Sequence, residues 1–109
     1  MTIDLDRRRL CAAAVLLPLL TQRVRADEAT VKIENFSFTP DTLNVKAGTM
    51  VIWSNDDDIP HSVVTTDGKV HSRALDTTET FRFTFATPGT YDYFCGLHPH
   101  MKGRIIVTP

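Results

Sequence analysis

One segment near the C-terminus combines a strand signal with a cluster of metal-binding side chains. It reads Pro88-Gly89-Thr90-Tyr91-Asp92-Tyr93-Phe94-Cys95-Gly96-Leu97-His98-Pro99-His100-Met101. The Pro-Gly pair is a turn signal, and the aromatic alternation after it predicts a strand from Tyr91 to Phe94. A thiol, an imidazole and a thioether then fall within the seven residues from Cys95 to Met101. The segment therefore predicts a metal site on a loop at the end of a β-strand.

The rest of the chain after residue 30 alternates apolar and polar residues with a period of two, as strands do. The apolar members are Val31/Ile33, Phe36/Phe38, Leu43/Val45, Val51/Trp53, Phe81/Phe83/Phe85 and Ile105/Val107. The phase shifts by one residue between the first two pairs, which predicts a bulge near Asn35. Turn signals recur about every eight to twelve residues, and no stretch has helical periodicity. We expect an all-β sandwich of about eight strands, with Trp53 and the phenylalanines of 81–85 in its core and residues 66–80 as an irregular crossover or short edge strands.

The first 26 residues have the three parts of an export signal. Arg7–Arg9 form a positive start, and Leu10–Leu20 form an apolar run that is too short to span a bilayer. Val24 and Ala26 provide small residues at the spacing that a signal peptidase requires. An amphipathic first helix is the alternative, but Pro18 interrupts the run. We expect a cleaved signal peptide over 1–26 and export to the periplasm, by the Sec or the twin-arginine route.

Residues 27–109 are long enough for one small sandwich domain. They carry seven basic against eleven acidic residues and therefore a formal net charge of −4. This balance argues against nucleic-acid binding, and we expect a monomer without stable membrane insertion. Removal of the leader takes away Cys11 and leaves Cys95 as the one thiol, in a compartment where thiols tend to be oxidised. Cys95 then has no cysteine partner within the chain, which favours a metal-ligand role over a disulfide.

The donor types around Cys95 fit copper. Thiolate and thioether suit Cu(I), imidazole suits both oxidation states, and a blue-copper site combines two histidines, one cysteine and a weak axial methionine. The loop supplies Cys95, His98 and Met101, so a second histidine comes from elsewhere. His61 directly follows the Trp53 strand and is the best candidate. The sequence thus predicts one copper ion held by His61, Cys95, His98 and Met101.

Several of these residues have alternative assignments. His100 competes with His98, and His71 competes with His61; we expect both rivals to be exposed, with His100 beside the metal where a partner docks. Met101 is alternatively a core residue. Zinc prefers cysteine, histidine and carboxylate ligands over methionine. Asp56–Asp58 lack the spacing of a calcium loop and are expected to be a solvated turn.

Three runs of this sequence resemble the cupredoxins. They are Phe36-x-Phe38-x-Pro40 followed by Leu43-x-Val45-x-x-Gly48, Val51-x-Trp53-x-Asn55-x-Asp57-x-x-Pro60-His61, and Pro88-Gly89-Thr90-Tyr91-x-Tyr93-x-Cys95-x-x-His98-Pro99-x-Met101-x-Gly103. The resemblance covers nearly all of residues 30–108, and the short ligand loop is similar to that of the amicyanin branch. It implies an eight-stranded Greek-key sandwich with the four ligands named above. It also implies a protein that is not an enzyme and that shuttles single electrons between larger redox proteins of the dehydrogenase and cytochrome type, by transient contact around His98.

Two positions depart from the amicyanin pattern. Ser62 stands where the branch usually has asparagine, and we expect it to tie the two ligand loops and to donate its N–H to the Cys95 sulfur. Leu97 replaces proline and keeps an N–H, which predicts a second hydrogen bond to the sulfur. We therefore expect a higher reduction potential than that of a Leu97→Pro variant.

The alternative function is copper carriage or sequestration in the periplasm, a binding function in which redox cycling is incidental.

Overall fold

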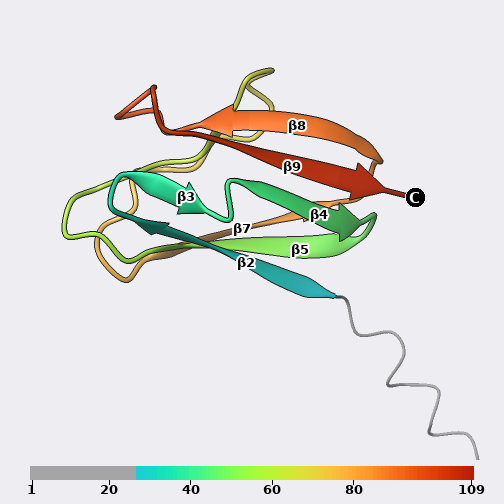
Figure 1. Ribbon diagram of the computed structural model, residues 1–109, viewed down its shortest axis with the longest axis horizontal. Coiled ribbons are helices and arrows are strands. Elements are labelled where there is room, and N and C mark those ends of the chain that lie inside the picture. Colours follow the sequence, from blue (N-terminus) through green and yellow to red (C-terminus); the bar gives the residue numbers. More distant parts are fainter. Residues whose placement is uncertain (1–26) are drawn as a thin grey trace, which may run out of the picture.

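The computed structural model describes residues 27–109, so the predicted signal peptide lies outside the described residues. Eight strands form two four-stranded layers that face each other (Figure 1). Their bounds are β2 Glu28–Glu34, β3 Ser37–Thr39, β4 Thr42–Lys46, β5 Thr49–Asn55, β6 Val64–Thr65, β7 Thr80–Phe85, β8 Gly89–Phe94 and β9 Lys102–Thr108. Over residues 27–109 no helix occurs that is long and apolar enough to cross a membrane. The predicted all-β sandwich is confirmed.

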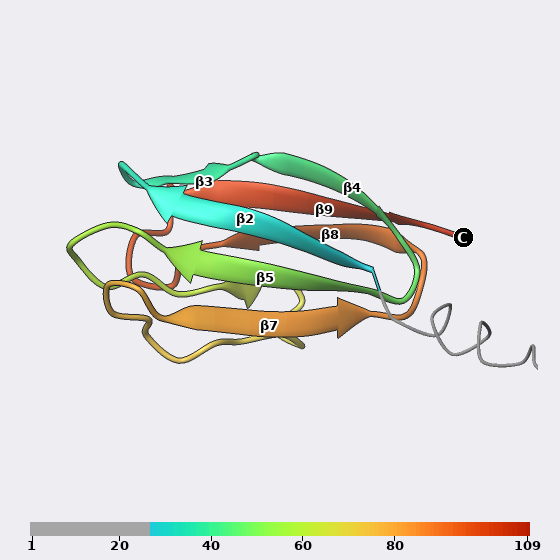
Figure 2. The same cartoon turned by 90° about the horizontal axis from the view of Figure 1, so that it is seen from below.

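The two sheets have the orders β3-β2-β5-β7 and β4-β9-β8-β6 (Figure 2). The pairs β2/β5 and β4/β9 are parallel, and the remaining pairs are antiparallel. The chain changes sheets between β3 and β4, across Pro40 and Asp41. Proline has no N–H to give to a strand ladder, so it suits this break.

The connection of β2 to β3 differs from the predicted bulge. Glu34 pairs with Ser37, so Asn35 and Phe36 alone form the turn of a β-hairpin. Their φ angles are 55° and 57°. Positive φ at both central residues is the mark of a type I′ turn, whose twist matches that of the flanking strands. The shift of apolar phase in the sequence therefore marks a reversal of the chain and not a bulge.

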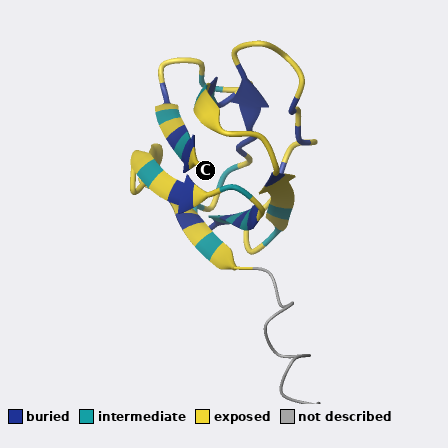
Figure 3. Ribbon diagram, turned by 90° about the vertical axis from the view of Figure 1, so that its right-hand side faces the viewer, coloured by how far each residue is buried: buried dark blue, intermediate teal, exposed yellow. Residues whose placement is uncertain are grey.

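The core lies between the two sheets, where buried and exposed residues alternate along the strands (Figure 3). Trp53 of β5 packs edge-on against Tyr93 of β8, with ring centroids 5.5 Å apart. The expectation for the 81–85 phenylalanines holds only in part. Phe85 is buried, but Phe83 is 37% exposed. The reason is that β7 is an edge strand, and within residues 27–109 no other strand pairs with its outer side.

Residues 66–80 form the expected irregular crossover. Two isolated bridges tie this segment to the loop after β5 and to β6, namely His61 to Leu75 and Val64 to His71. Val70 and Leu75 contribute buried apolar side chains, so the segment covers the flank of the sandwich. It thereby supports the backbone on both sides of His61.

Candidate metal centre

One end of the sandwich gathers the turns that matter for the site (Figure 1). The β2–β3 turn, the loop after β5 and the loop between β8 and β9 all lie at this end. His61 belongs to the second of these segments, and Cys95 and His98 belong to the third. Residues separated by more than 30 positions in sequence thus meet because their strands end at one pole.

The ligand atoms of His61, Cys95 and His98 lie within 4.8 Å of one another. The sulfur of Cys95 is 3.7 Å from Nδ1 of His61 and 3.7 Å from Nδ1 of His98. His61 and Cys95 are fully buried, whereas His98 is half-buried. The cluster therefore has a sealed inner part and one edge that reaches the surface.

These separations fit a metal ion bound by sulfur and nitrogen. For bonds of about 2.3 Å to sulfur and about 2.0 Å to nitrogen, a separation of 3.7 Å corresponds to an angle of about 120° at the metal. That is the angle of a trigonal plane, and trigonal His₂Cys donors are those of a blue-copper site. The residues present therefore fit copper.

The loop from Cys95 to Met101 is closed by its own backbone. The N–H of His98 donates to the Cys95 carbonyl (3.2 Å), and the N–H of Met101 donates to the His98 carbonyl (2.9 Å). The N–H of Cys95 donates to the Met101 carbonyl (3.0 Å). Met101 is 3% exposed and belongs to the same buried cluster as Cys95. These bonds fix the spacing of three of the predicted ligands before any metal binds.

Ser62 joins the two ligand loops, as the sequence predicts. Its N–H lies 3.4 Å from the Cys95 sulfur, and its Oγ accepts the N–H of Gly96 at 2.9 Å. The second hydrogen bond expected from Leu97 is not found, since among residues 27–109 the backbone N–H that donates to this sulfur is that of Ser62. Leu97 instead turns outward and is 51% exposed.

His61 is held by the last residue of β5, Asn55, and by Asp57 in the turn that follows. Asn55 is buried, and its Nδ2 donates to the carbonyls of Ile59 (2.9 Å) and Leu75 (2.8 Å). The Asp57 carboxylate lies 2.7 Å from Nε2 of His61. A carboxylate only accepts hydrogen bonds, so the ring nitrogen that carries a proton toward Asp57 is Nε2. Nδ1 lies on the side of the Cys95 sulfur and is the nitrogen placed to bind a metal.

Asp57 also organises the β2–β3 turn. Its two carboxylate oxygens accept the N–H groups of Asn35 (2.7 Å) and Phe36 (3.1 Å). Burial opposes ionisation of this carboxyl, but the hydrogen bonds from Phe36, Asn35 and His61 outweigh it and hold the pKa of Asp57 below its usual value. The predicted solvated turn is therefore wrong for Asp57, although Asp56 and Asp58 are exposed.

Phe36 was expected in a strand and lies instead beside the centre. Its ring is edge-on to His61 (centroids 5.6 Å apart) and to His98 (5.2 Å). The two imidazole centroids are themselves 5.1 Å apart, so the three rings form one cluster. His100 and His71 are exposed, as predicted, and stand outside the ligand cluster.

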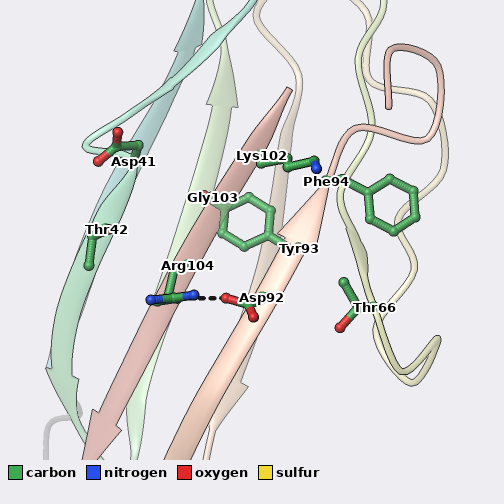
Figure 4. A pocket seen from close by; sticks show the side chains of 9 residues that line it. All are labelled: Asp41, Thr42, Thr66, Asp92, Tyr93, Phe94, Lys102, Gly103 and Arg104. Carbon is green, nitrogen blue, oxygen red and sulfur yellow. Dashed lines mark hydrogen bonds and ion pairs between the residues drawn. The ribbon is translucent and has the colours of Figure 1, made fainter. Parts of the chain in front are cut away.

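A separate hollow of about 410 Å³ lies over β8 and β9 (Figure 4). Arg104 and Asp92, two of the residues that line it, form an ion pair with 2.6 Å between Nε and Oδ1. The Tyr93 ring lies over Gly103, where a Cβ atom would overlap with it. This hollow contains none of the residues of the ligand cluster.

Comparisons with known proteins agree with the geometry. The family model of the cupredoxin-like domain matches residues 9–107. The chain is 36% identical to amicyanin-alpha of Methylorubrum extorquens over 91 residues, which cover 79% of this chain and 76% of that protein. It is 35% identical to amicyanin of Paracoccus versutus over 95 residues, 83% and 72% of the two chains. Its fold is similar to that of a purple cupredoxin from Nitrosopumilus maritimus, with a TM-score of 0.69, 31% identity and coverage of 73% and 99%.

Proposed function

We propose, given that this chain belongs to the cupredoxin family, that it carries single electrons between larger redox proteins of the periplasm. The chain is a blue copper electron carrier close to amicyanin, and it is not an enzyme. In our proposal the metal ligands are His61, Cys95, His98 and Met101. The observation that carries the proposal is the equal distance of 3.7 Å from the Cys95 sulfur to Nδ1 of each histidine.

Copper bound here supplies a couple between Cu(II) and Cu(I), and the donors offered are acceptable to both states. The protein's part is to keep those donors in one place. The Ser62 N–H orients the sulfur, Asp57 fixes the tautomer of His61, and the backbone bonds of the 95–101 loop fix His98. Donors that are already in position do not rearrange when an electron arrives or leaves, which favours fast transfer.

The electron path to a partner runs through the surface edge of His98. The Phe36 ring lies edge-on to His98, and Phe36 and Leu97 are 49% and 51% exposed. Pro60 and Pro99 are also exposed, and we propose that these four side chains form an apolar rim around this edge. Redox partners commonly meet over small contact areas below about 1,200 Å², which gives short-lived complexes. We propose such transient contacts with proteins of the dehydrogenase and cytochrome type, steered by the net charge of −4 on residues 27–109.

The proposal that the protein is exported is based on its amino-acid sequence. The basic start and short apolar run of residues 1–26 support a signal peptide that is removed before Asp27. The periplasm is consistent with a thiol that is kept as a metal ligand. Mass spectrometry of the protein recovered from the periplasm tests this part, and a mature chain that still contains residues 1–26 would contradict it.

Electron self-exchange separates electron transfer from copper carriage. We expect the copper-loaded protein to titrate reversibly with one electron and to show NMR line broadening that grows with the fraction oxidised. We also expect it to retain copper in the presence of a Cu(I) chelator. Slow self-exchange together with rapid copper loss to the chelator would favour carriage instead.

A further inference from the structure

Phe36 occupies a backbone conformation that its side chain disfavours. Both central residues of the β2–β3 turn have positive φ, and in such turns the second position usually holds glycine. An aromatic residue in the left-handed region is an outlier and persists only where its surroundings enforce it. A glycine at position 36 would fit this turn without strain. The ring of Phe36 is therefore retained against a local preference.

Hydrogen bonds to the Asp57 carboxylate enforce this conformation of the β2–β3 turn. The Asp57 carboxylate accepts the N–H groups of both turn residues, at 2.7 Å from Asn35 and 3.1 Å from Phe36. The same carboxylate accepts Nε2–H of His61. One side chain thus connects the strained turn directly to a predicted metal ligand.

The ring itself packs on the ligands. Phe36 lies edge-on to both imidazoles, at interplanar angles of 89° with His61 and 87° with His98. Edge-on aromatic contacts are attractive beyond the burial of area. Phe36 remains 49% exposed, whereas His61 beneath it is fully buried. The outer ring therefore covers the inner one and contributes little to the main core.

From these observations we propose that Phe36 is a positioning residue, a lid that locks the two ligand imidazoles together and slows the release of copper. The inference rests on the proposed ligand set. Release requires at least one imidazole to swing away from the sulfur, and both rings are held against Phe36. Without the aromatic ring, the His98 imidazole has no contact with residue 36 on its exposed side and swings away from the sulfur more often.

The experiment measures copper release from the reduced protein to a Cu(I) chelator, for the wild type and for F36A, F36G and F36Y. We expect F36A and F36G to release copper about tenfold faster, because both lose the ring contacts with the two histidines. F36Y keeps the ring and should release copper at the wild-type rate. The metal-free F36G protein should melt at a higher temperature than metal-free F36A, because only alanine keeps the strain of positive φ.

Phe83 offers a matched control, since it is also an exposed phenylalanine and lies on edge strand β7. F83A should leave the release rate unchanged. Wild-type release rates in F36A and F36G would overturn the lid while leaving the proposed function intact. Failure of the wild type to bind copper with a blue colour would instead overturn the proposed function. A release rate that follows the melting temperature across all variants, F83A included, would reduce Phe36 to a residue that serves stability only.

Discussion

The Oγ of Ser62 accepts the N–H of Gly96 at 2.9 Å, and this hydrogen bond joins the loop that carries His61 to the loop that carries Cys95. The neighbouring N–H of Ser62 meets the Cys95 sulfur at 3.4 Å. The serine therefore has two separable roles. Its backbone contacts the sulfur of the proposed ligand Cys95, and its side chain fixes the distance between the loops.

Ser62→Ala removes the side-chain role alone. The Gly96 N–H loses its partner, which should lower the free energy of unfolding by about 1 kcal/mol. The backbone bond to the sulfur persists, so the blue absorption band should remain. Chemical denaturation and a visible spectrum check the two parts, with Ser54→Ala as a control away from the cluster. Loss of the band in Ser62→Ala would show that the hydroxyl also shapes the ligand set.

Gly96→Ala should be more disruptive than its small size suggests. A Cβ at this position would lie 2.8 Å from Ser62 Oγ and 3.3 Å from Val64 Cγ2. Overpacking of this kind typically lowers the free energy of unfolding by about 1–3 kcal/mol. Combining Gly96→Ala with Ser62→Ala should recover part of this loss, since the clashing hydroxyl is gone. Strictly additive losses in denaturation of the double variant would contradict the account.

Asp57→Asn tests the carboxylate that holds His61 and the β2–β3 turn. An amide has one accepting oxygen, so its NH₂ group would face one or more of the three N–H donors that now meet the carboxylate. We expect copper affinity to fall by about 10- to 100-fold, as for other residues that orient metal-bound histidines. A competitive titration measures the affinity, and Asp58→Asn is the matched control because Asp58 is exposed. Equal affinity in both variants would contradict the proposed role of Asp57.

Acid should abolish the contribution of Asp67 to stability. The Lys69 N–H and the Thr65 hydroxyl donate to this carboxylate and hold the pKa of Asp67 below its ordinary value of 3.8. A carboxyl with a lowered folded-state pKa stabilises the protein above that ordinary value, and the gain is lost as the pH falls through the folded-state pKa. The metal-free wild type should therefore melt higher than Asp67→Ala at neutral pH, and the gap should narrow below pH 3.8. A gap that stays constant down to about pH 2 would contradict this.

The sequence revealed what depends on short spacing. Cys95 and His98 are three residues apart on one loop, and this loop follows a strand with clear apolar alternation. Both the strand and this half of the centre could therefore be predicted from neighbouring residues in the sequence. His61 required an assumption about which strand ends meet, and the structure supports it through the cluster. The failed predictions for Asp57, Phe36 and Phe83 depend on long-range contacts that local patterns do not encode.

Three failures illustrate this. Three consecutive aspartates look alike in sequence, and only the arrival of the Asn35-Phe36 turn distinguishes Asp57 from its neighbours. Phe36 looks like a strand residue because it is two positions from Phe38, yet backbone φ is set by the hairpin and by Asp57. Phe83 was expected to be buried and is exposed for a similar reason, because the position of a strand at the edge is a property of the whole sheet.

The central claim is that Cys95 forms the thiolate bond of a blue-copper site. The most direct measurement is the visible absorption spectrum of the purified protein after addition of Cu(II), compared with that of Cys95→Ser. The account predicts an intense blue band in the wild type, which is lost on reduction and absent from the variant. A colourless wild type, or a variant with the same band, would contradict it.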